Sequence, residues 1–323
     1  MRKLFPWLAL LALLLSGCGG SSYIYQDFLL NTEVSVTVYR YGDRAAAQEA
    51  LELCGSYEKI FSRTDPDSEL YRLNRREIST VSPELAQVIS LGLDYARRSG
   101  GAFDISMGGV SELWDFTAPA PQIPASEEVA ERLAHTGWET VTVDGDTVSF
   151  ADPETILDLG GIAKGYIADR MADYLREQGV ASATISLGGN IYCLGKKLDG
   201  SPFQIGIQYP YEERNQVIGG LPASDQSVVT SGLYERCFTA NGKLYHHILD
   251  PNTGWPVENG LLAVSIVSGR SVDGDALSTA CFVLGLEEGM ALIETTEGAE
   301  AVFITEDFQL HLSSGLEGIF YEA

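Results

Sequence analysis

Positive charge is scarce in this chain of 323 residues, which has 21 Lys and Arg against 45 Asp and Glu and a formal net charge of −24. The deficit argues against a nucleic-acid partner, because such binding depends on neutralising phosphates with basic side chains. The chain also lacks a Cys-x-x-Cys pair, so its cysteines do not indicate a zinc or redox site. Four of them lie far apart among apolar neighbours and are predicted to be buried free thiols: Cys54, Cys193, Cys237 and Cys281.

No long Pro/Ser/Gly linker or low-complexity tract divides the chain, so one compact unit is expected. Hydrophobic periodicity and turn residues predict helices over 45–61, from Ser82-Pro83 to Gly100-Gly101, and from Gly160-Gly161 to Gly179. They also predict strands over 34–38, 156–159, 183–187 and 261–267, and hairpins at Asp144-Gly145 and Glu306-Asp307. Strands and helices mix without strict βαβ alternation, which favours the α+β class with mixed or antiparallel sheets and packed helices.

The N-terminus is typical of a bacterial lipoprotein signal. Arg2 and Lys3 precede an apolar run from Leu4 to Leu15 that is too short to span a bilayer, and small residues follow before Cys18. Residues 1–17 are therefore predicted to be a cleaved signal peptide, with lipidation at Cys18 and a short tether over 18–22. The remaining residues, 23–323, would form the functional domain.

Two glycine turns are candidates for a ligand crevice. Asp158-Leu-Gly-Gly-Ile-Ala-Lys-Gly165 could bring backbone amides and the Lys164 ammonium to a phosphate at a helix N-terminus. It matches neither the dinucleotide-fold fingerprint nor a Walker loop, and taken alone a Gly-Gly turn more often serves packing. Asp158 needs a partner in its apolar segment. Ser186-Leu-Gly-Gly-Asn190 repeats the pattern, so the two turns would lie at one edge of the sheet.

Two further segments carry chemistry-bearing side chains. Asp275 and Thr279 stand four residues apart where a loop runs into a predicted helix after Asp275, so their oxygens would share one helical face and could bind a hard metal. The alternative is a helix cap with an i to i+4 contact. His246-His247-Ile-Leu-Asp-Pro-Asn-Thr-Gly254 could hold a catalytic or a structural histidine. Neighbouring strand residues point to opposite faces, so the pair is not expected to chelate one metal.

Together these segments resemble the FAD:protein FMN transferases, the ApbE-like flavin transferase family, over nearly the whole chain after residue 22. The resemblance is carried in order by Phe61-Ser-Arg-Thr-Asp-Pro-Asp-Ser-Glu-Leu70, Gly101-Ala-Phe-Asp-Ile-Ser106 with Trp114, Asp158–Gly165, Ser186–Asn190, Ser231-Gly-Leu-Tyr-Glu-Arg236, His247–Gly254 and Asp275-Ala-Leu-Ser-Thr279.

The resemblance implies a T-fold-like core that binds FAD and Mg²⁺ and transfers the FMN moiety of FAD to a Thr or Ser hydroxyl of a partner protein, releasing AMP. Mg²⁺ would be bound by the side chains of Asp275 and Thr279 and the backbone carbonyl of Gly161, an oxygen set that suits a hard cation shared with substrate phosphates. His247 would be the general base. The residues expected to line the FAD cleft are Ala102, Phe103, Asp104, Asp158, Lys164 and Leu249.

The same resemblance implies acceptors that are FMN-binding domains of membrane electron-transfer proteins. The lipoprotein signal places the enzyme on the extracytoplasmic face of a bacterial cell membrane, the periplasmic side in a Gram-negative cell. Two alternatives stay open, a Mg²⁺-dependent FAD pyrophosphatase that gives FMN and AMP, and a non-catalytic flavin-binding lipoprotein. The chain departs from the family at Thr64, where an aromatic residue is common beside the flavin and for which Tyr71 or Trp114 could compensate, and at Asn31, where Gly is common.

Overall fold

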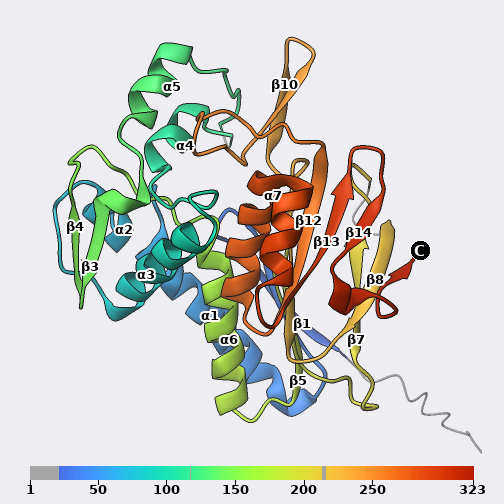
Figure 1. Ribbon diagram of the computed structural model, residues 1–323. Coiled ribbons are helices and arrows are strands. Elements are labelled where there is room, and N and C mark those ends of the chain that lie inside the picture. The colour runs from blue at the N-terminus through green and yellow to red at the C-terminus, as the bar shows by residue number, and fades with distance from the viewer. Residues whose placement is uncertain (1–21, 117, 213–215) are drawn as a thin grey trace, which may run out of the picture.

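An eight-stranded sheet forms the centre of the protein (Figure 1), in a computed structural model that describes residues 22–116, 118–212 and 216–323. All neighbouring strands pair antiparallel. The sheet is open, and its order from edge to edge is β1 (Tyr23–Leu29), β2 (Thr32–Val38), β5 (Ser182–Leu187), β6 (Asn190–Gly195), β9 (Gln226–Gly232), β12 (Leu261–Ser268), β13 (Ala299–Thr305) and β14 (Leu310–Leu312).

Three helices pack on this sheet and on one another. They are α1 (Arg44–Phe61) against β1 and β2, α6 (Ala163–Glu177) against β5 and β6, and α7 (Ser271–Glu294) against β9, β12 and β13. Strand β12 reads Leu-Leu-Ala-Val-Ser-Ile-Val-Ser and is buried at every residue, so both faces of the sheet are covered at its centre. The main apolar core lies between these layers.

Smaller elements complete the fold. Four further helices are α2 (Glu69–Asn74), α3 (Pro83–Arg98), α4 (Gly108–Trp114) and α5 (Ser126–Leu133). Two hairpins are β3 (Val141–Asp144) with β4 (Thr147–Phe150), and β10 (Cys237–Ala240) with β11 (Lys243–His246); a three-stranded sheet has β7 (Phe203–Gln208), β8 (Val217–Ala223) and β15 (Tyr321–Glu322). Short 3-10 turns are η1 (Tyr41–Asp43), η2 (Trp138–Thr140) and η3 (Ser314–Leu316). A second apolar cluster joins α4, α5 and the β10–β11 hairpin around Trp114.

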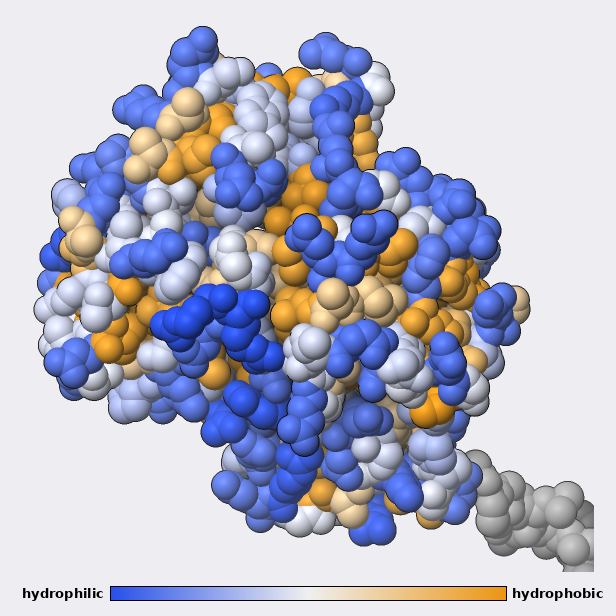
Figure 2. Space-filling view, in the orientation of Figure 1, coloured by the Kyte–Doolittle hydropathy of each residue, from blue (hydrophilic) through white to orange (hydrophobic). Residues whose placement is uncertain are grey.

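Helix α7 is long and apolar enough to cross a membrane by length and composition, but half of its apolar window is buried inside the protein. Gly285 has non-helical dihedrals (φ 82°, ψ −177°), which only glycine adopts readily, and interrupts the helix. Helix α7 is therefore a kinked core helix of the fold. The visible surface is mostly hydrophilic (Figure 2), as the large acidic excess requires.

The α+β prediction is confirmed, and so are most predicted elements. Ser82 caps α3 by accepting a hydrogen bond from the Leu85 amide (3.3 Å), with Pro83 in the first turn. The predicted hairpins are also present, as β3–β4 and β13–β14. All four cysteines are free; three are buried and Cys237 is half-buried. The predicted signal peptide and Cys18 lie outside the described residues.

One predicted element and one predicted boundary were wrong. Residues 156–159 form no strand; the segment makes one parallel bridge, from Ile156 to Met107, and the Leu157 backbone exchanges two hydrogen bonds with the Asn74 side chain of α2. Helix α7 begins at Ser271 rather than after Asp275, because the Asp169 carboxylate of α6 accepts hydrogen bonds from the Ser271 and Val272 amides (2.7 and 3.0 Å). A side chain from a distant element thus satisfies the free amides of the first turn.

Candidate active site

The site is built where the start of α6 crosses the first turns of α7. A Cβ on Gly165 would lie 2.4 Å from the Ser271 carbonyl oxygen and 2.6 Å from the Val272 Cα, so only glycine allows this approach. The crossing brings Lys164 and the Gly160-Gly161 turn against the face of α7 that carries Asp275. Residues separated by more than a hundred positions in sequence therefore meet through backbone packing.

The buried Asp275 carboxylate is shared by two groups of α6. Its Oδ2 accepts a hydrogen bond from the Gly165 amide (2.9 Å), and its Oδ1 lies 3.2 Å from the Lys164 Nζ, which also donates to the Gly160 carbonyl (3.0 Å). Asp275 sits inside α7, so it is not the helix cap that was the alternative interpretation. A buried carboxylate needs such compensation. The Lys164 ammonium beside Asp275 shows that this carboxylate attracts a cation.

Thr279 lies one turn further along α7, next to the Gly160-Gly161 turn. A Cβ on Gly161 would be 3.4 Å from the Thr279 Oγ1 and 3.0 Å from the Phe103 ring. The three residues predicted to bind Mg²⁺, Gly161, Asp275 and Thr279, thus come together at one place. The described residues contain no group of three or more His, Cys, Asp or Glu side chains able to hold a metal. One carboxylate, one hydroxyl and one carbonyl still fit Mg²⁺, which commonly takes few protein ligands and fills its sphere with water and substrate phosphate.

Asp158 has the partner that its apolar surroundings require. Its Oδ1 accepts the Gly160 amide (2.9 Å), and its Oδ2 lies 3.3 Å from the Arg63 Nε. Arg63 also contacts Glu112, at 3.0 Å. The sequence indicated that Asp158 needed a partner but did not identify Arg63, whose only signal was its place in the segment 61–70. The pair fixes the Gly160-Gly161 turn against the loop after α1.

The predicted cleft residues at 102–104 lie in the loop after α3. Ala102 and Phe103 are buried, and Phe103 contacts Gly161. The Asp104 carboxylate accepts hydrogen bonds from the Ser106 amide and hydroxyl (2.7 Å each) and the Trp138 amide (3.1 Å), while burial raises its pKa. Asp104 therefore shapes the loop that presents Phe103.

The two histidines occupy different environments at the end of β11. The His246 Nε2 contacts the Val257 carbonyl oxygen (2.9 Å) and its ring packs on Phe282, which makes it a structural residue. His247 is half-buried, and its Nδ1 is buried with no hydrogen-bond partner in the described chain. Burial, and then the positive charges of Arg236, His246 and Lys164, lower the pKa of His247 to about 3. His247 is therefore a neutral imidazole that can accept a proton, and Leu249 lies two residues beyond it, buried against Trp114's cluster.

The second glycine turn also reaches α7. Gly188 and Gly189 connect β5 to β6, and the buried Asn190 that follows accepts a hydrogen bond from the Ser271 hydroxyl (2.7 Å). A Cβ on Gly189 would lie 2.5 Å from the Glu235 carboxylate, next to Arg236. Both predicted turns therefore lie beside the first turns of α7. Only Gly188-Gly189 joins two strands of the sheet, so the prediction that both turns lie at one sheet edge is wrong.

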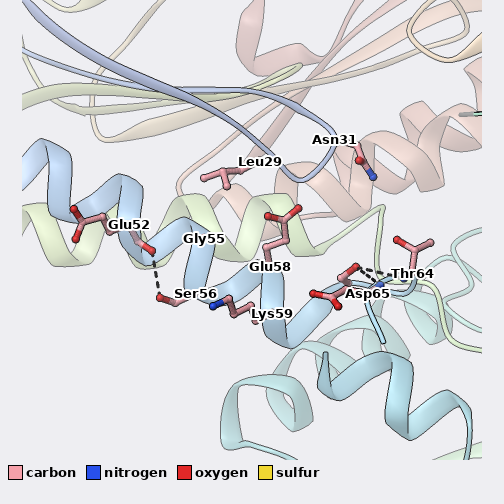
Figure 3. Close-up of a pocket in the computed structure, with 10 residues that line it drawn as sticks. Leu29, Asn31, Glu52, Gly55, Ser56, Glu58, Lys59, Thr64 and Asp65 are labelled. Atoms are coloured by element: carbon pink, nitrogen blue, oxygen red, sulfur yellow. Dashed lines mark hydrogen bonds between the residues drawn. The ribbon is translucent and has the colours of Figure 1, made fainter. Parts of the chain in front are cut away.

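A groove of about 520 Å³ lies between the β1–β2 turn and α1 (Figure 3). Its walls include Leu29, Asn31, Lys59 and Thr64, so the two positions at which the sequence departs from the family pattern face the same groove. Arg63 links this wall to Asp158. Trp114 cannot compensate for Thr64, because it is fully buried and donates its indole hydrogen bond to the Gly254 carbonyl (2.9 Å).

This fold defines an α+β protein in which a buried carboxylate, a hydroxyl and an ammonium meet between two helices. The ApbE family profile matches residues 30–303, and the chain belongs to the ApbE family. The chain is similar to the FAD:protein FMN transferase of Klebsiella pneumoniae strain 342, with 37% identity over 90% of this chain and 92% of that one. It is similar to the FAD:protein FMN transferase of Treponema pallidum strain Nichols, with 34% identity over 93% and 90%.

Solved structures agree with this assignment. The ApbE protein of Thermotoga maritima superposes with a TM-score of 0.85 and 32% identity, over 93% of this chain and 99% of that one. The flavin transferase ApbE of Vibrio cholerae superposes with a TM-score of 0.81 and 28% identity, over the same shares. The family resemblance of the sequence is confirmed.

Proposed function

We propose that the protein is a Mg²⁺-dependent FAD:protein FMN transferase that moves the FMN moiety of FAD to a Thr or Ser hydroxyl of a partner protein. The observation that carries the proposal is the meeting of Asp275, Thr279 and the Gly160-Gly161 turn beside the Lys164 ammonium at the start of α6. Family membership and the names of the relatives support the same activity. In one step, the acceptor oxygen bonds to the FMN phosphorus, the bond from that phosphorus to the bridging oxygen breaks, and AMP leaves.

The chain's own residues bind and orient the substrates. Lys164 and the positive end of α6 attract the FAD pyrophosphate. Asp158, held by Arg63, keeps the Gly160-Gly161 turn in place beside it. Mg²⁺, when bound by Asp275, Thr279 and the Gly161 carbonyl, would neutralise charge on the pyrophosphate oxygens.

His247 is proposed to take the proton of the acceptor hydroxyl as general base. The low pKa of His247 arises partly from the positive charges of Arg236 and Lys164. A bound pyrophosphate places negative charge beside these groups and so raises that pKa toward the working range of a base. The neutral, unpartnered imidazole of the free protein is thus prepared for its role by substrate binding.

The flavin is proposed to reach the groove lined by Leu29, Asn31 and Thr64 (Figure 3). A threonine in place of an aromatic residue removes ring stacking at this wall, so flavin affinity would depend more on the pyrophosphate contacts. Tyr71, half-buried on α2, is the remaining aromatic candidate in the segment that follows Thr64.

One incubation separates the transferase from its alternatives. Chain 23–323 is mixed with FAD, Mg²⁺ and a candidate FMN-binding domain of a membrane electron-transfer protein, and products are weighed. A transferase adds the mass of FMN to the acceptor and releases an equal amount of AMP. Free FMN with AMP and no acceptor mass gain would indicate a pyrophosphatase, and no AMP at all would indicate a flavin-binding protein without chemistry.

We also propose that the protein is lipid-anchored at Cys18 on the extracytoplasmic face of a bacterial cell membrane, after removal of residues 1–17. Acyl chains supply the anchor, since the acidic body is repelled by anionic lipid. The Cys18→Ala variant is expected to lose membrane fixation and keep flavin transfer. If the Cys18→Ala variant still sedimented with membranes after a salt wash, lipidation at Cys18 would not be the anchor.

A further inference from the structure

Strand β1 exposes apolar side chains at an open edge of the main sheet. Ile24 is 60% and Phe28 71% exposed, and both lie on the face of the strand away from α1, with Gln26 between them. The outer edge of β1 pairs with no other strand of the described chain. Such an edge with apolar side chains requires a cover or a partner.

Aromatic and basic groups flank the start of the strand on its other face, the one that carries Tyr23 and packs on α1. Tyr41 is 68% exposed, and its ring meets that of Tyr23 edge-on at 5.9 Å. The Arg44 guanidinium lies 3.7 Å from the Tyr41 ring centroid and 5.4 Å from that of Tyr23. Tyrosine and arginine together are characteristic of the headgroup region of a bilayer, where an apolar body and a polar tip are both solvated.

The short distance along the chain between β1 and Cys18 indicates that the bilayer contacts this strand. Strand β1 starts at Tyr23, five residues after Cys18, and five extended residues span at most about 17 Å. Acyl chains on Cys18 therefore keep the start of β1 within about 17 Å of the bilayer surface. The rest of the body carries a large acidic excess that is repelled by anionic lipid, so this local patch has the composition to touch the surface.

We propose that the β1 edge, with Ile24 and Phe28 on one face of the strand and Tyr41 beside Tyr23 on the other, is the membrane-contacting surface of the protein and fixes its orientation on the bilayer. The proposal rests on the lipidation of Cys18 proposed above. Glu33, paired opposite Phe28, is exposed and keeps the contact at headgroup depth. The groove beside Leu29 and Asn31 starts at the far end of β1, about 20 Å along the strand. In this orientation the site faces acceptor proteins whose hydroxyl groups lie close to the bilayer.

The test uses an indole at two matched positions of the full-length lipoprotein, introduced as Phe28→Trp and Phe308→Trp. Phe308 is also exposed, at 38%, but lies in the β13–β14 turn at the opposite edge of the sheet. Each variant is reconstituted in vesicles with brominated acyl chains. Relative to the protein without either substitution, which carries Trp114, Trp138 and Trp255, the indole at position 28 is expected to add emission at shorter wavelength that the brominated chains quench, whereas the emission added at position 308 matches its value in unbrominated vesicles.

Separate readouts keep the linked proposals distinguishable. Mass analysis of the purified chain reports acylation of Cys18, and flavin transfer to a soluble acceptor reports activity and folding. If Cys18 is not acylated, the same variants are coupled through Cys18 to a maleimide lipid in a Cys237→Ser background, since the other three thiols are buried. Equal quenching at both positions in the anchored chain would overturn the membrane-contacting surface. The proposal would also be overturned if the chain without lipid or detergent sedimented as a dimer and the indole at position 28 were buried in that dimer.

Discussion

Replacing Asp275 by Asn tests the centre of the proposed site, because it keeps the size of the side chain and removes its charge. The carboxylate now accepts from the Gly165 amide and the Lys164 ammonium. The amide oxygen can keep one of these contacts, but its NH₂ group turns a donor toward the other. Hydrogen bonds to charged groups contribute about 1.5–3 kcal/mol, and Lys164 regains water because its side chain is about a quarter exposed.

The fold should therefore survive the change. A loss of about 1–3 kcal/mol in the free energy of unfolding lowers Tm by only a few degrees in a domain of this size. Flavin transfer should fall at least about 10²-fold, since loss of even the outer partners of a metal ligand commonly costs 10- to 100-fold. Higher Mg²⁺ is expected to restore little of this rate.

The assay follows AMP release and acceptor mass gain over a Mg²⁺ titration, beside thermal unfolding. Asp273→Asn is the matched control, because Asp273 lies in the first turn of α7 but points to the Tyr95 hydroxyl (2.7 Å) and Arg270. The control should lose some stability and keep its Mg²⁺ dependence. Wild-type transfer by Asp275→Asn at limiting Mg²⁺ would refute the metal assignment and the proposed mechanism with it.

Three further variants test other parts of the site. His247→Ala should retain FAD affinity and slow transfer by about 10²- to 10⁴-fold, as loss of a general base does; an unchanged rate across pH would make His247 structural. Burial raises the pKa of Asp169 from 3.8 to about 6 despite its two amide hydrogen bonds. The protonated Asp169 side chain therefore stabilises the fold fully below about pH 4. As the pH rises through about 6, the free energy of unfolding falls by about 3 kcal/mol. Denaturant titrations should show this decline in the wild type and not in Asp169→Asn. Gly165→Ala should destabilise the protein by about 2–3 kcal/mol through its contact with Ser271, whereas Gly269→Ala, with open space around it, should be neutral in the same melts.

Local signals predicted the elements whose formation depends on neighbouring residues. Ser82-Pro83 begins a helix and Asp144-Gly145 forms a hairpin because each uses contacts within a few positions. The start of α7 could not be predicted in this way, since Asp169 caps it from α6. Leu157 and Leu159 are buried as strand residues would be, but the Leu157 backbone bonds to the Asn74 side chain, a partner that periodicity does not reveal.

In the candidate site, too, the sequence indicated which side chains carry the chemistry but not their distant contacts. Side-chain chemistry singled out Asp275, Thr279 and Lys164, and the need of Asp158 for a partner could be stated from its surroundings. The identity of that partner, Arg63, depends on a contact across 95 positions that no spacing encodes. Trp114 is a second example: its place in the sequence motif suggested a position near the flavin, but the side chain is enclosed by the second apolar cluster. That burial also depends on contacts between distant residues, which the sequence alone does not indicate.

The crossing of α6 and α7 at Gly165 also decides how experiments on this enzyme can be interpreted. The two helices approach through main-chain atoms at Gly165, and the Asp169 and Asp275 carboxylates add hydrogen bonds between them. Truncating Thr279, which takes no part in these contacts, therefore removes a functional group while the helix crossing is kept. Kinetic losses in such variants measure chemistry, and a redesigned ligand set can be installed on the same backbone without rebuilding the domain.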